Sequence, residues 1–196
     1  MTEIIKFNTE ELAKVNVVNV PIQVKIFNLV PENHPILKQV LPEFDFLNAP
    51  VNPNEFASSL VETCKINKGI GLSANQCGFP YRVFVMGAND DYVAFFNPKI
   101  INKSDNEIHM LEGCLSFPLL GLKITRPESI GVEYQDFNGI KRQTVINGLS
   151  ARCFQHELSH LNGLTMLDET KPLALKTGLK KRKKLINELF RYKKET

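Results

Sequence analysis

The chain has 196 residues, a length that fits one compact domain with a substantial core. Its hydrophobic fraction of 43%, charged fraction of 23% and net charge of +3 are ordinary for a globular protein. No apolar run approaches the ~18 residues needed to cross a bilayer, and the start of the chain lacks the features of a secretory signal or transit peptide. Four cysteines without a CxxC pair argue against a disulfide scaffold, so we expect a cytoplasmic protein with free thiols and no membrane partner.

The predicted strands lie in the middle of the chain, after a first helix. Residues 54–67 should form a helix, because their apolar side chains recur on one face. Short segments rich in β-branched or aromatic residues predict strands at 82–86, 92–96, 131–134 and 141–146. Turn-forming residues at 87–90 and 138–139 bound several of these strands.

A further helix is predicted over residues 149–161, with Ser150 as its N-cap and Gly163 just past its end. Strands around one buried central helix indicate an α+β domain. We therefore predict mixed or antiparallel strands around this helix, followed by a basic C-terminal helix. No internal repeat is visible.

The central helix carries two histidines four residues apart, His156 and His160, with Glu157 between them. In a helix, positions i and i+4 lie one above the other, so both imidazoles can converge on one metal ion. Glu157 lies beside that face and can reach a metal-bound water without being a ligand. These are the parts of a hydrolytic metal site, which needs a third protein ligand.

Three choices of the third ligand can be compared. A third histidine would have to stand where the chain has Met166, and a thioether is a poor ligand for a hard divalent ion. A downstream carboxylate is a weak choice, because Asp168 and Glu169 follow too closely for a second helix and the other two acidic residues lie in a basic tail. A thiolate from elsewhere is the remaining choice, and Cys114, next to a glycine, is the best candidate.

Three segments in order carry a resemblance to a known family. Residues 69–76 read Gly-Ile-Gly-Leu-Ser-Ala-Asn-Gln, residues 112–116 read Glu-Gly-Cys-Leu-Ser, and residues 155–163 read Gln-His-Glu-Leu-Ser-His-Leu-Asn-Gly. On these motifs the chain resembles the peptide deformylases over roughly residues 30 to 170, where residues 35–37 are also similar to an early family segment. One position departs from the family pattern, since Ser159 stands where the family has Asp.

The resemblance implies that Cys114, His156 and His160 hold one divalent metal ion and leave one position open for water. It implies Fe(II) as the physiological ion, with Zn(II) or Ni(II) as alternatives. The implied activity is a metal-dependent hydrolase that removes the N-formyl group from the N-terminal formylmethionine of nascent polypeptides and releases formate. N-formylmethionyl peptides are then the substrates, and no specific DNA binding is expected.

Catalytic roles also follow from the resemblance. Glu157 would take a proton from water and later deliver it to the leaving amine. The side-chain amide of Gln76 and the backbone N–H of Leu115 would donate hydrogen bonds to the oxyanion of the tetrahedral intermediate.

Three residues are expected to contact the substrate. Gly71 would line the slot for the formyl group, where the absence of a Cβ lets the substrate backbone pair alongside the strand. Leu149 and Cys153 lie one to two turns before the first histidine, so we expect them to line an apolar pocket for the methionine side chain.

Two residues near the motifs have open roles. Glu112 fits an ion pair with Arg126 and fits direct substrate contact equally well. Ser159 points about 100° away from the neighbouring histidine on a helix, so it should not touch the metal. Its hydroxyl replaces only part of the support that the usual Asp gives, which lowers the expected rate or metal affinity.

Two other functions fit parts of the pattern. A general metallopeptidase shares the two histidines and the glutamate, but no third His or second-helix Glu completes such a site. A non-catalytic protein with a structural metal would close the site with four protein ligands, whereas only three are identifiable. Formate release from formyl-Met-Ala peptides, with Glu157→Gln as the control, separates these readings.

The tail from residue 171 to 196 holds ten of the 24 Lys and Arg residues but two of the 21 Asp and Glu residues. Leucines and an isoleucine recur at helical spacing, and residues 180–184 are all basic. A solvated helix face and a phosphate-rich partner surface both fit this pattern. In bacterial members of the family a basic C-terminal helix docks on the ribosome, so the resemblance implies the second. We divide the chain into an extension without predicted role (1–30), a deformylase-like domain (31–170) and a basic helix (171–196).

Overall fold

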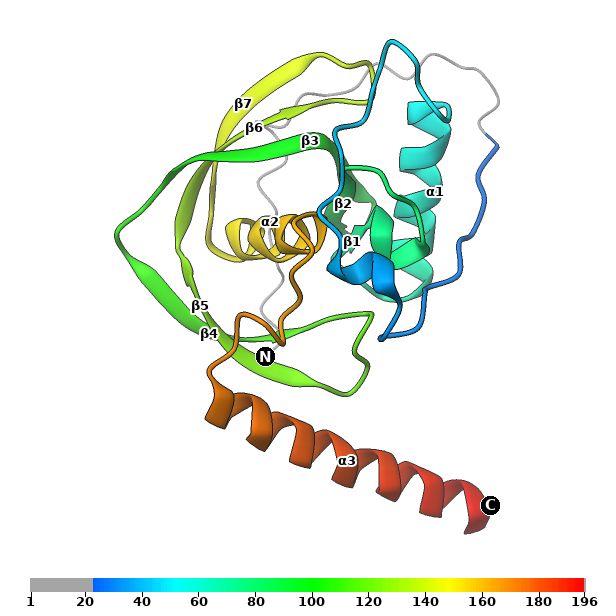
Figure 1. The fold of residues 1–196 in the computed structure, drawn as a ribbon, viewed down its shortest axis with the longest axis vertical. Coiled ribbons are helices and arrows are strands. Elements are labelled where there is room, and N and C mark those ends of the chain that lie inside the picture. The colour runs from blue at the N-terminus through cyan, green and yellow to red at the C-terminus, as the bar shows by residue number, and fades with distance from the viewer. Residues whose placement is uncertain (1–22, 196) are drawn as a thin grey trace.

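The computed structural model describes residues 23–195, which form two antiparallel sheets and three α-helices (Figure 1). This arrangement confirms the predicted α+β class. The first 22 residues of the predicted N-terminal extension lie outside the described residues. Within the described residues, no helix combines the length and apolar character that crossing a membrane requires.

The larger sheet has five strands in the order β1-β2-β3-β6-β7, and every neighbouring pair is antiparallel. Its strands are β1 (Gly71–Ser73), β2 (Val83–Ala88), β3 (Asp91–Lys103), β6 (Ser129–Gln135) and β7 (Lys141–Asn147). The four predicted strands are thus confirmed. The turns between them are confirmed too, with Asn89 and Gly139 in the left-handed region at φ +56° and +78°.

The smaller sheet pairs β4 (Glu107–Gly113) with β5 (Gly121–Pro127). Neither strand was predicted from the sequence. In β5 every second side chain is buried, as in a strand with one face on the core. The last of these buried residues is Arg126, and a charge on the inner face hides the apolar alternation that marks a strand.

The first helix, α1 (Pro53–Ile66), confirms the prediction at 54–67. It begins after Asn52, whose side-chain oxygen accepts hydrogen bonds from the N–H groups of Asn54 and Glu55 at 3.0 and 3.1 Å. Two short 3₁₀ helices, η1 (Pro35–Lys38) and η2 (Ala74–Cys77), lie near it in the chain.

Helix α2 (Gly148–Leu161) crosses the interior of the fold, between the strands of the larger sheet and above β4 and β5 (Figure 1). All its residues from Ala151 to Leu161 are buried. The ring of Phe154 packs edge-on against Phe84 and Phe95, with centroids 5.0 and 5.3 Å apart. A central helix clamped on all sides holds its polar side chains in fixed positions.

The prediction that Ser150 caps α2 is wrong. The helix begins at Gly148, directly after the last residue of β7. Gly148 has φ +58°, which lets the chain turn from strand to helix without an intervening loop. Its N–H donates to the carbonyl of Glu128, so the sharp turn is also tied to the sheet.

Helix α3 (Pro172–Glu195) is the predicted basic C-terminal helix. Its first turns pack on β5: a Cβ at Gly178 would lie 2.5 Å from a methyl group of Leu122, and Leu175 packs against the neighbouring apolar cluster. Arg182 fixes the middle of the helix through Glu32 and the carbonyl of Pro118. Beyond that residue, the helix projects away from the rest of the molecule (Figure 1).

Candidate metal centre and active site

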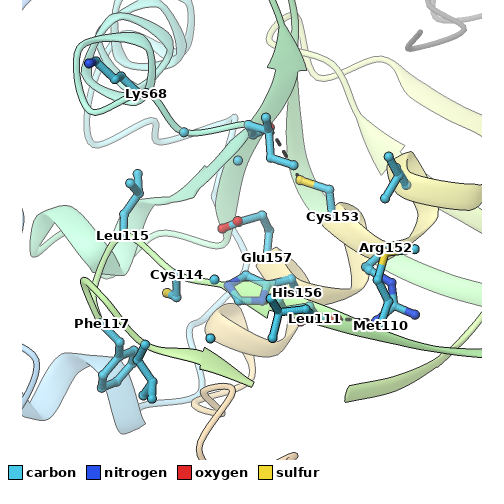
Figure 2. A pocket seen from close by; sticks show the side chains of 18 of the residues that line it. Lys68, Met110, Leu111, Cys114, Leu115, Phe117, Arg152, Cys153, His156 and Glu157 are labelled. Carbon is cyan, nitrogen blue, oxygen red and sulfur yellow. Dashed lines mark hydrogen bonds and ion pairs between the residues drawn. The ribbon is translucent and has the colours of Figure 1, made fainter. Parts of the chain in front are cut away.

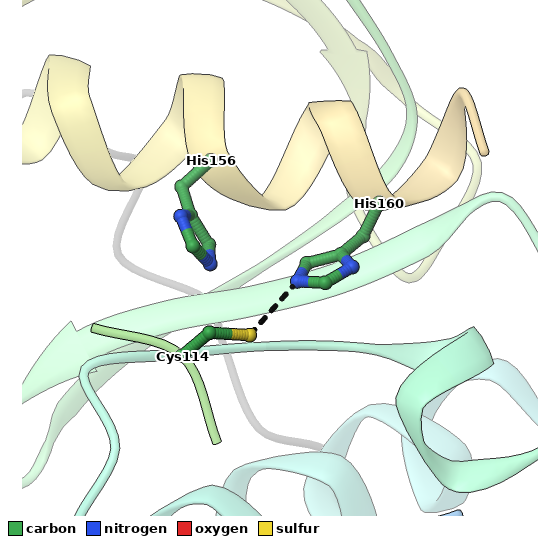
Figure 3. A group of neighbouring side chains, drawn as sticks. All are labelled: Cys114, His156 and His160. Carbon is green, nitrogen blue, oxygen red and sulfur yellow. Dashed lines mark hydrogen bonds between the residues drawn. The ribbon is translucent and has the colours of Figure 1, made fainter. Parts of the chain in front are cut away.

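Helix α2 and the segment after β4 bring the three predicted metal ligands together. The rings of His156 and His160 project from one face of α2 toward Cys114 (Figure 3). One ligand atom from each residue lies within 4.8 Å of the other two. The Sγ atom of Cys114 is 3.2 Å from Nε2 of His160. The spacing of the two histidines and the family resemblance together predicted this grouping.

The donor set fits a divalent cation. His156 has Nδ1 engaged with a carboxylate oxygen of Glu112 at 3.0 Å, which leaves Nε2 for a metal. Burial, followed by the nearby His156, lowers the pKa of His160 well below its usual value, so this ring is in the neutral form that coordinates metals. A thiolate with two imidazoles suits Fe(II), Zn(II), Ni(II) or Co(II).

The surroundings of His156 are rich in negative charge. Burial by itself lowers the pKa of His156, but hydrogen bonds to Cys114 and Glu112 outweigh burial and raise this pKa well above its usual value. A pocket that attracts a proton this strongly also attracts a divalent cation, because both respond to the same field. The electrostatics therefore agree with the donor set.

Glu112 is held inside the protein by three cationic or polar partners. Arg126 donates to both carboxylate oxygens at 2.7 and 3.0 Å, and Arg152 of α2 donates to Oε1 at 2.6 Å. Burial raises the pKa of Glu112, but hydrogen bonds from His156 and Arg126 outweigh burial and lower it to about 2. Of the two readings left open, the ion pair is the one that these contacts support.

Glu157 lies beside the ligand group with its carboxylate fixed. Ser73 donates a 2.6 Å hydrogen bond to Oε2, and a Cβ at Gly71 would lie 2.5 Å from Oε1. Burial raises the pKa of Glu157, while the charge of His156 and the Ser73 hydrogen bond oppose that rise. A raised pKa makes a carboxyl group a better acceptor of a proton, as a general base requires. Ser73 was not predicted, since its contact spans 84 residues of sequence.

Gln76 is also held in place. Its Oε1 accepts the N–H of Ser73 at 2.9 Å, which fixes the amide so that Nε2 points the other way. Nε2 donates to Ser116 Oγ at 3.0 Å and lies 3.5 Å from Cys114 Sγ. A side-chain donor therefore stands next to the ligand group, together with the backbone of Leu115, which follows Cys114.

A pocket of about 570 Å³ opens over these residues (Figure 2). His160 lies beneath it, 1% exposed, while the other eight predicted site residues line it: Gly71, Gln76, Cys114, Leu115, Leu149, Cys153, His156 and Glu157. Further apolar wall residues were missed, because they belong to β4 and the approach to β5: Met110, Leu111, Phe117, Leu119 and Leu120. An apolar pocket with a few convergent polar groups is the usual form of a small-ligand site.

The hydroxyl of Ser159, which has one proton to donate, lies 2.9 Å from the carbonyl oxygen of Gln155 and 2.8 Å from Oε1 of Glu169. Neither partner belongs to the ligand group. The role of Glu169 was not predicted, although the departure at position 159 is the signal that could have directed attention to it.

Known proteins resemble the chain in both sequence and structure. The family model described as polypeptide deformylase matches residues 26–176. A peptide deformylase of Mesorhizobium japonicum is 35% identical over 159 residues, which cover 79% of this chain and 89% of that protein. One of Dictyoglomus thermophilum is 36% identical over 143 residues, which cover 73% of this chain and 92% of that protein.

Two solved structures agree with these relatives. The peptide deformylase of Synechococcus elongatus, in complex with actinonin, aligns with a TM-score of 0.74 at 30% identity and covers 80% of this chain and 87% of that one. The peptide deformylase of Thermotoga maritima aligns with a TM-score of 0.69 at 32% identity and covers 76% of this chain and 99% of that one.

Proposed function

The chain belongs to the peptide deformylase family, and from that membership we propose which of its residues carry out the family reaction. The protein is a hydrolase that removes the N-formyl group from nascent peptides. One observation supports this assignment of residues: the possible ligand atoms of Cys114, His156 and His160 lie close together at a pocket that Cys114, His156 and Glu157 line.

The enzyme uses one divalent metal ion. We assign Cys114, His156 and His160 as its ligands, and Fe(II) as the physiological ion, with Zn(II) or Ni(II) accepted by the same donors. Held there, such an ion would supply the acidity that makes water a nucleophile at neutral pH and would polarise a carbonyl group. Three protein ligands rather than four support a catalytic rather than a structural site.

Glu157 is the general base and then the general acid. Its carboxylate takes a proton from the attacking water and later gives it to the amine that leaves the formyl carbon. The hydrogen bond from Ser73 holds Oε2, so Oε1 is the oxygen left to exchange the proton. Oε1 is also the oxygen next to Gly71, at the edge of strand β1.

Gln76 and Leu115 stabilise the oxyanion of the tetrahedral intermediate. The Nε2 of Gln76 is already oriented toward Cys114 by the hydrogen bond between its Oε1 and the N–H of Ser73. Because its orientation is set before the reaction, little reorganisation is needed as negative charge develops. The backbone N–H of Leu115 supplies the second donor.

Gly71, Leu149 and Cys153 bind the substrate. All three line the pocket, together with the apolar side chains of β4. Without a Cβ at position 71, the backbone of a peptide can approach strand β1 closely. Leu149 and Cys153 lie on the face of α2 that bounds the pocket, where an unbranched apolar side chain such as methionine fits.

The experiment that tests this assignment is formate release from formyl-Met-Ala peptides by the metal-loaded enzyme. Replacing Glu157 with Gln should lower turnover roughly 10²- to 10⁴-fold and leave the metal content unchanged. Glu188→Gln, on the exposed face of α3, is the matched control and should behave as wild type. A Glu157→Gln enzyme with full turnover would exclude Glu157 as the base.

We further propose that α3 attracts the enzyme to the ribosome. Lys180, Lys181, Lys183 and Lys184 are exposed on either side of Arg182, the residue that ties the middle of the helix to Glu32 and Pro118. Exposed charges of one sign attract a phosphate-rich surface over long range. Ribosomal RNA offers such a surface where formylated chains emerge, and we accordingly propose the cytoplasm as the location of the enzyme.

Co-sedimentation with ribosomes tests the role of α3. Replacing Lys180, Lys181 and Lys183 with Gln should weaken binding and flatten its dependence on salt. This triple variant keeps Leu175 and Gly178, which pack against the body, so the helix itself stays in place. The same change at the exposed Lys103, Lys123 and Lys141 is the control, and equal loss in both variants would rule out a specific role for α3.

The division of the chain follows the same lines. We propose residues 31–170 as the catalytic domain and residues 171–196 as the basic helix. Residues 1–30 form the extension, and its described part runs beside α1, where the N–H groups of Lys25 and Phe27 donate to Ser59 and Thr63.

A further inference from the structure

We propose that Glu169 is a positioning residue for the metal centre and supplies the carboxylate that the family pattern places at position 159. Glu169 follows α2 in the segment that leads to α3. It acts through Arg126 and Glu112 on His156. The inference rests on the proposed function, because it takes His156 to be a metal ligand.

The contacts of Glu169 form a continuous path to the ligand. Its two oxygens accept hydrogen bonds from the two terminal nitrogens of Arg126 at 3.0 and 2.7 Å, in the forked arrangement that fixes a guanidinium plane. The other edge of Arg126 binds Glu112 at 2.7 and 3.0 Å. Glu112 in turn accepts from Nδ1 of His156 at 3.0 Å, which sets the orientation of that ring.

Glu169 balances the charge of the buried cluster formed by Glu112, Arg126 and Arg152. Two guanidinium groups, Arg126 and Arg152, bind the single carboxylate of Glu112, and the side chains of all three are less than 10% exposed. With Glu112 alone, this buried cluster would carry one excess positive charge beside the site of a divalent cation. The carboxylate of Glu169 brings the cluster to zero. Because Glu169 also binds Arg126, Glu112 does not balance the charge of Arg126 alone. The hydrogen bond between Glu112 and His156 is therefore stronger.

Ser159 and Glu169 are matched to each other. The hydroxyl of Ser159 donates to Oε1 of Glu169 at 2.8 Å, so it supports that carboxylate and carries no charge of its own. An Asp at position 159 would place a second carboxylate against the first, and the two would repel. The chain therefore has room for one carboxylate at this end of Arg126, and it is supplied by the segment after α2 rather than by α2 itself.

A four-protein cycle tests the proposal: wild type, Glu169→Gln, Ser159→Asp and the double variant. The readout is Co(II) affinity, followed by the absorption of the thiolate–Co(II) bond, together with kcat/KM for formate release. We expect Glu169→Gln to bind Co(II) roughly 10- to 100-fold more weakly. Ser159→Asp alone should also weaken binding, through repulsion between the two carboxylates. The double variant should recover most of the wild-type affinity, because it again has one carboxylate next to Arg126.

Recovery of Co(II) affinity in the double variant distinguishes a positioning role of Glu169 from a role in stability alone. Two substitutions that each damaged the fold independently would have additive effects and would not cancel. Asp168→Asn, the neighbouring acid in an exposed pair with Lys38, is the matched control and should leave Co(II) affinity unchanged. Wild-type affinity in Glu169→Gln, or no recovery in the double variant, would overturn the proposal. If Glu169→Gln does not fold, the double variant still decides, since it must fold and bind Co(II). Co(II) absorption that persists in Cys114→Ala would instead count against the proposed ligands.

Discussion

Helices α2 and α3 both carry functional charge, but they hold it in opposite ways. Helix α2 is buried from Ala151 to Leu161, and protein groups contact its ionisable side chains at defined atoms. Helix α3 leaves the lysines of its 180–184 run exposed to solvent. The difference follows from the task of each helix. Bond-breaking needs groups fixed to a fraction of an ångström, whereas attraction to a charged surface needs only net charge.

The same difference has an energetic side. Removing one partner of a buried charge pair leaves the other partner desolvated and unpaired, which costs about 3–5 kcal/mol. An exposed pair contributes only about 0–1 kcal/mol, because water and salt replace the lost partner. Substitutions of one chemical kind should therefore have very different effects on α2 and α3.

The largest difference in the free energy of unfolding is expected between Arg152→Met on α2 and Arg182→Met on α3. Arg152 donates to Glu112 and to the carbonyls of Ile108 and Ile124, all of which lose a donor in the variant. We expect a loss of about 3 kcal/mol in the free energy of unfolding of the metal-free protein, measured by denaturant titration.

Arg182→Met removes the same charge and inserts the same side chain. The Arg182 side chain is 15% exposed, but its partners are open to solvent: the Glu32 side chain is 48% exposed and Pro118 is an exposed residue. Water can therefore take the place of the guanidinium. We expect a loss of at most about 1 kcal/mol. Equal losses in the two variants would show that the buried network around Glu112 has no special weight in the stability of the fold.

A smaller difference in effect is expected between two glycine-to-alanine substitutions, each at a glycine that lets a neighbouring side chain lie close to the backbone. Gly71→Ala places a methyl group about 2.5 Å from Glu157 Oε1 and 2.7 Å from Cys153 Sγ. Overpacking of this kind costs about 1–3 kcal/mol. Because Ser73 fixes the other oxygen of Glu157, the carboxylate must tilt, and we expect turnover to fall on the order of 10²-fold.

Gly178→Ala in α3 is the counterpart. Its methyl group would meet only the end of the buried Leu122 side chain, and alanine favours the helix by about 1 kcal/mol over glycine, which opposes the cost of that contact. We expect the free energy of unfolding to change by less than about 1 kcal/mol and formate release to stay at the wild-type rate. Normal turnover in Gly71→Ala would mean that the carboxylate of Glu157 is not confined there.

Local patterns were enough to predict much of the fold. The strands β2, β3, β6 and β7 contain runs of β-branched and aromatic residues, and all three α-helices show apolar residues at helical spacing. The far half of β3 was missed because Asn97, at φ +50°, and Pro98 look like a strand end, although the strand continues through a register shift. Three-residue β1 is too short to show any periodicity.

The site was predictable only where a motif marked it. The ligand set and Glu157 follow from spacing and from the resemblance, and the structure brings them together. The roles of Arg152 and Glu169 have no local pattern, and although Ser73 stands inside a motif, its contact with Glu157 has none. Each of the three acts through a partner at least 10 and up to 84 residues away in sequence. Such contacts depend on the packing of α2 against both sheets, which periodicity does not specify.

The smallest effect on stability is expected from substitutions in the exposed lysine run of α3. Lys180 and Lys183 lie three residues apart on α3, as do Lys181 and Lys184, so like charges face each other along the helix. Replacing Lys180, Lys181 and Lys183 with Gln relieves repulsion of about 0.2–0.5 kcal/mol per pair. We expect a thermal midpoint slightly above wild type in low salt, equal midpoints in high salt, and unchanged formate release. A drop in the midpoint at low salt would show that these lysines make stabilising contacts with the body of the protein, and the contrast with α2 would then fail.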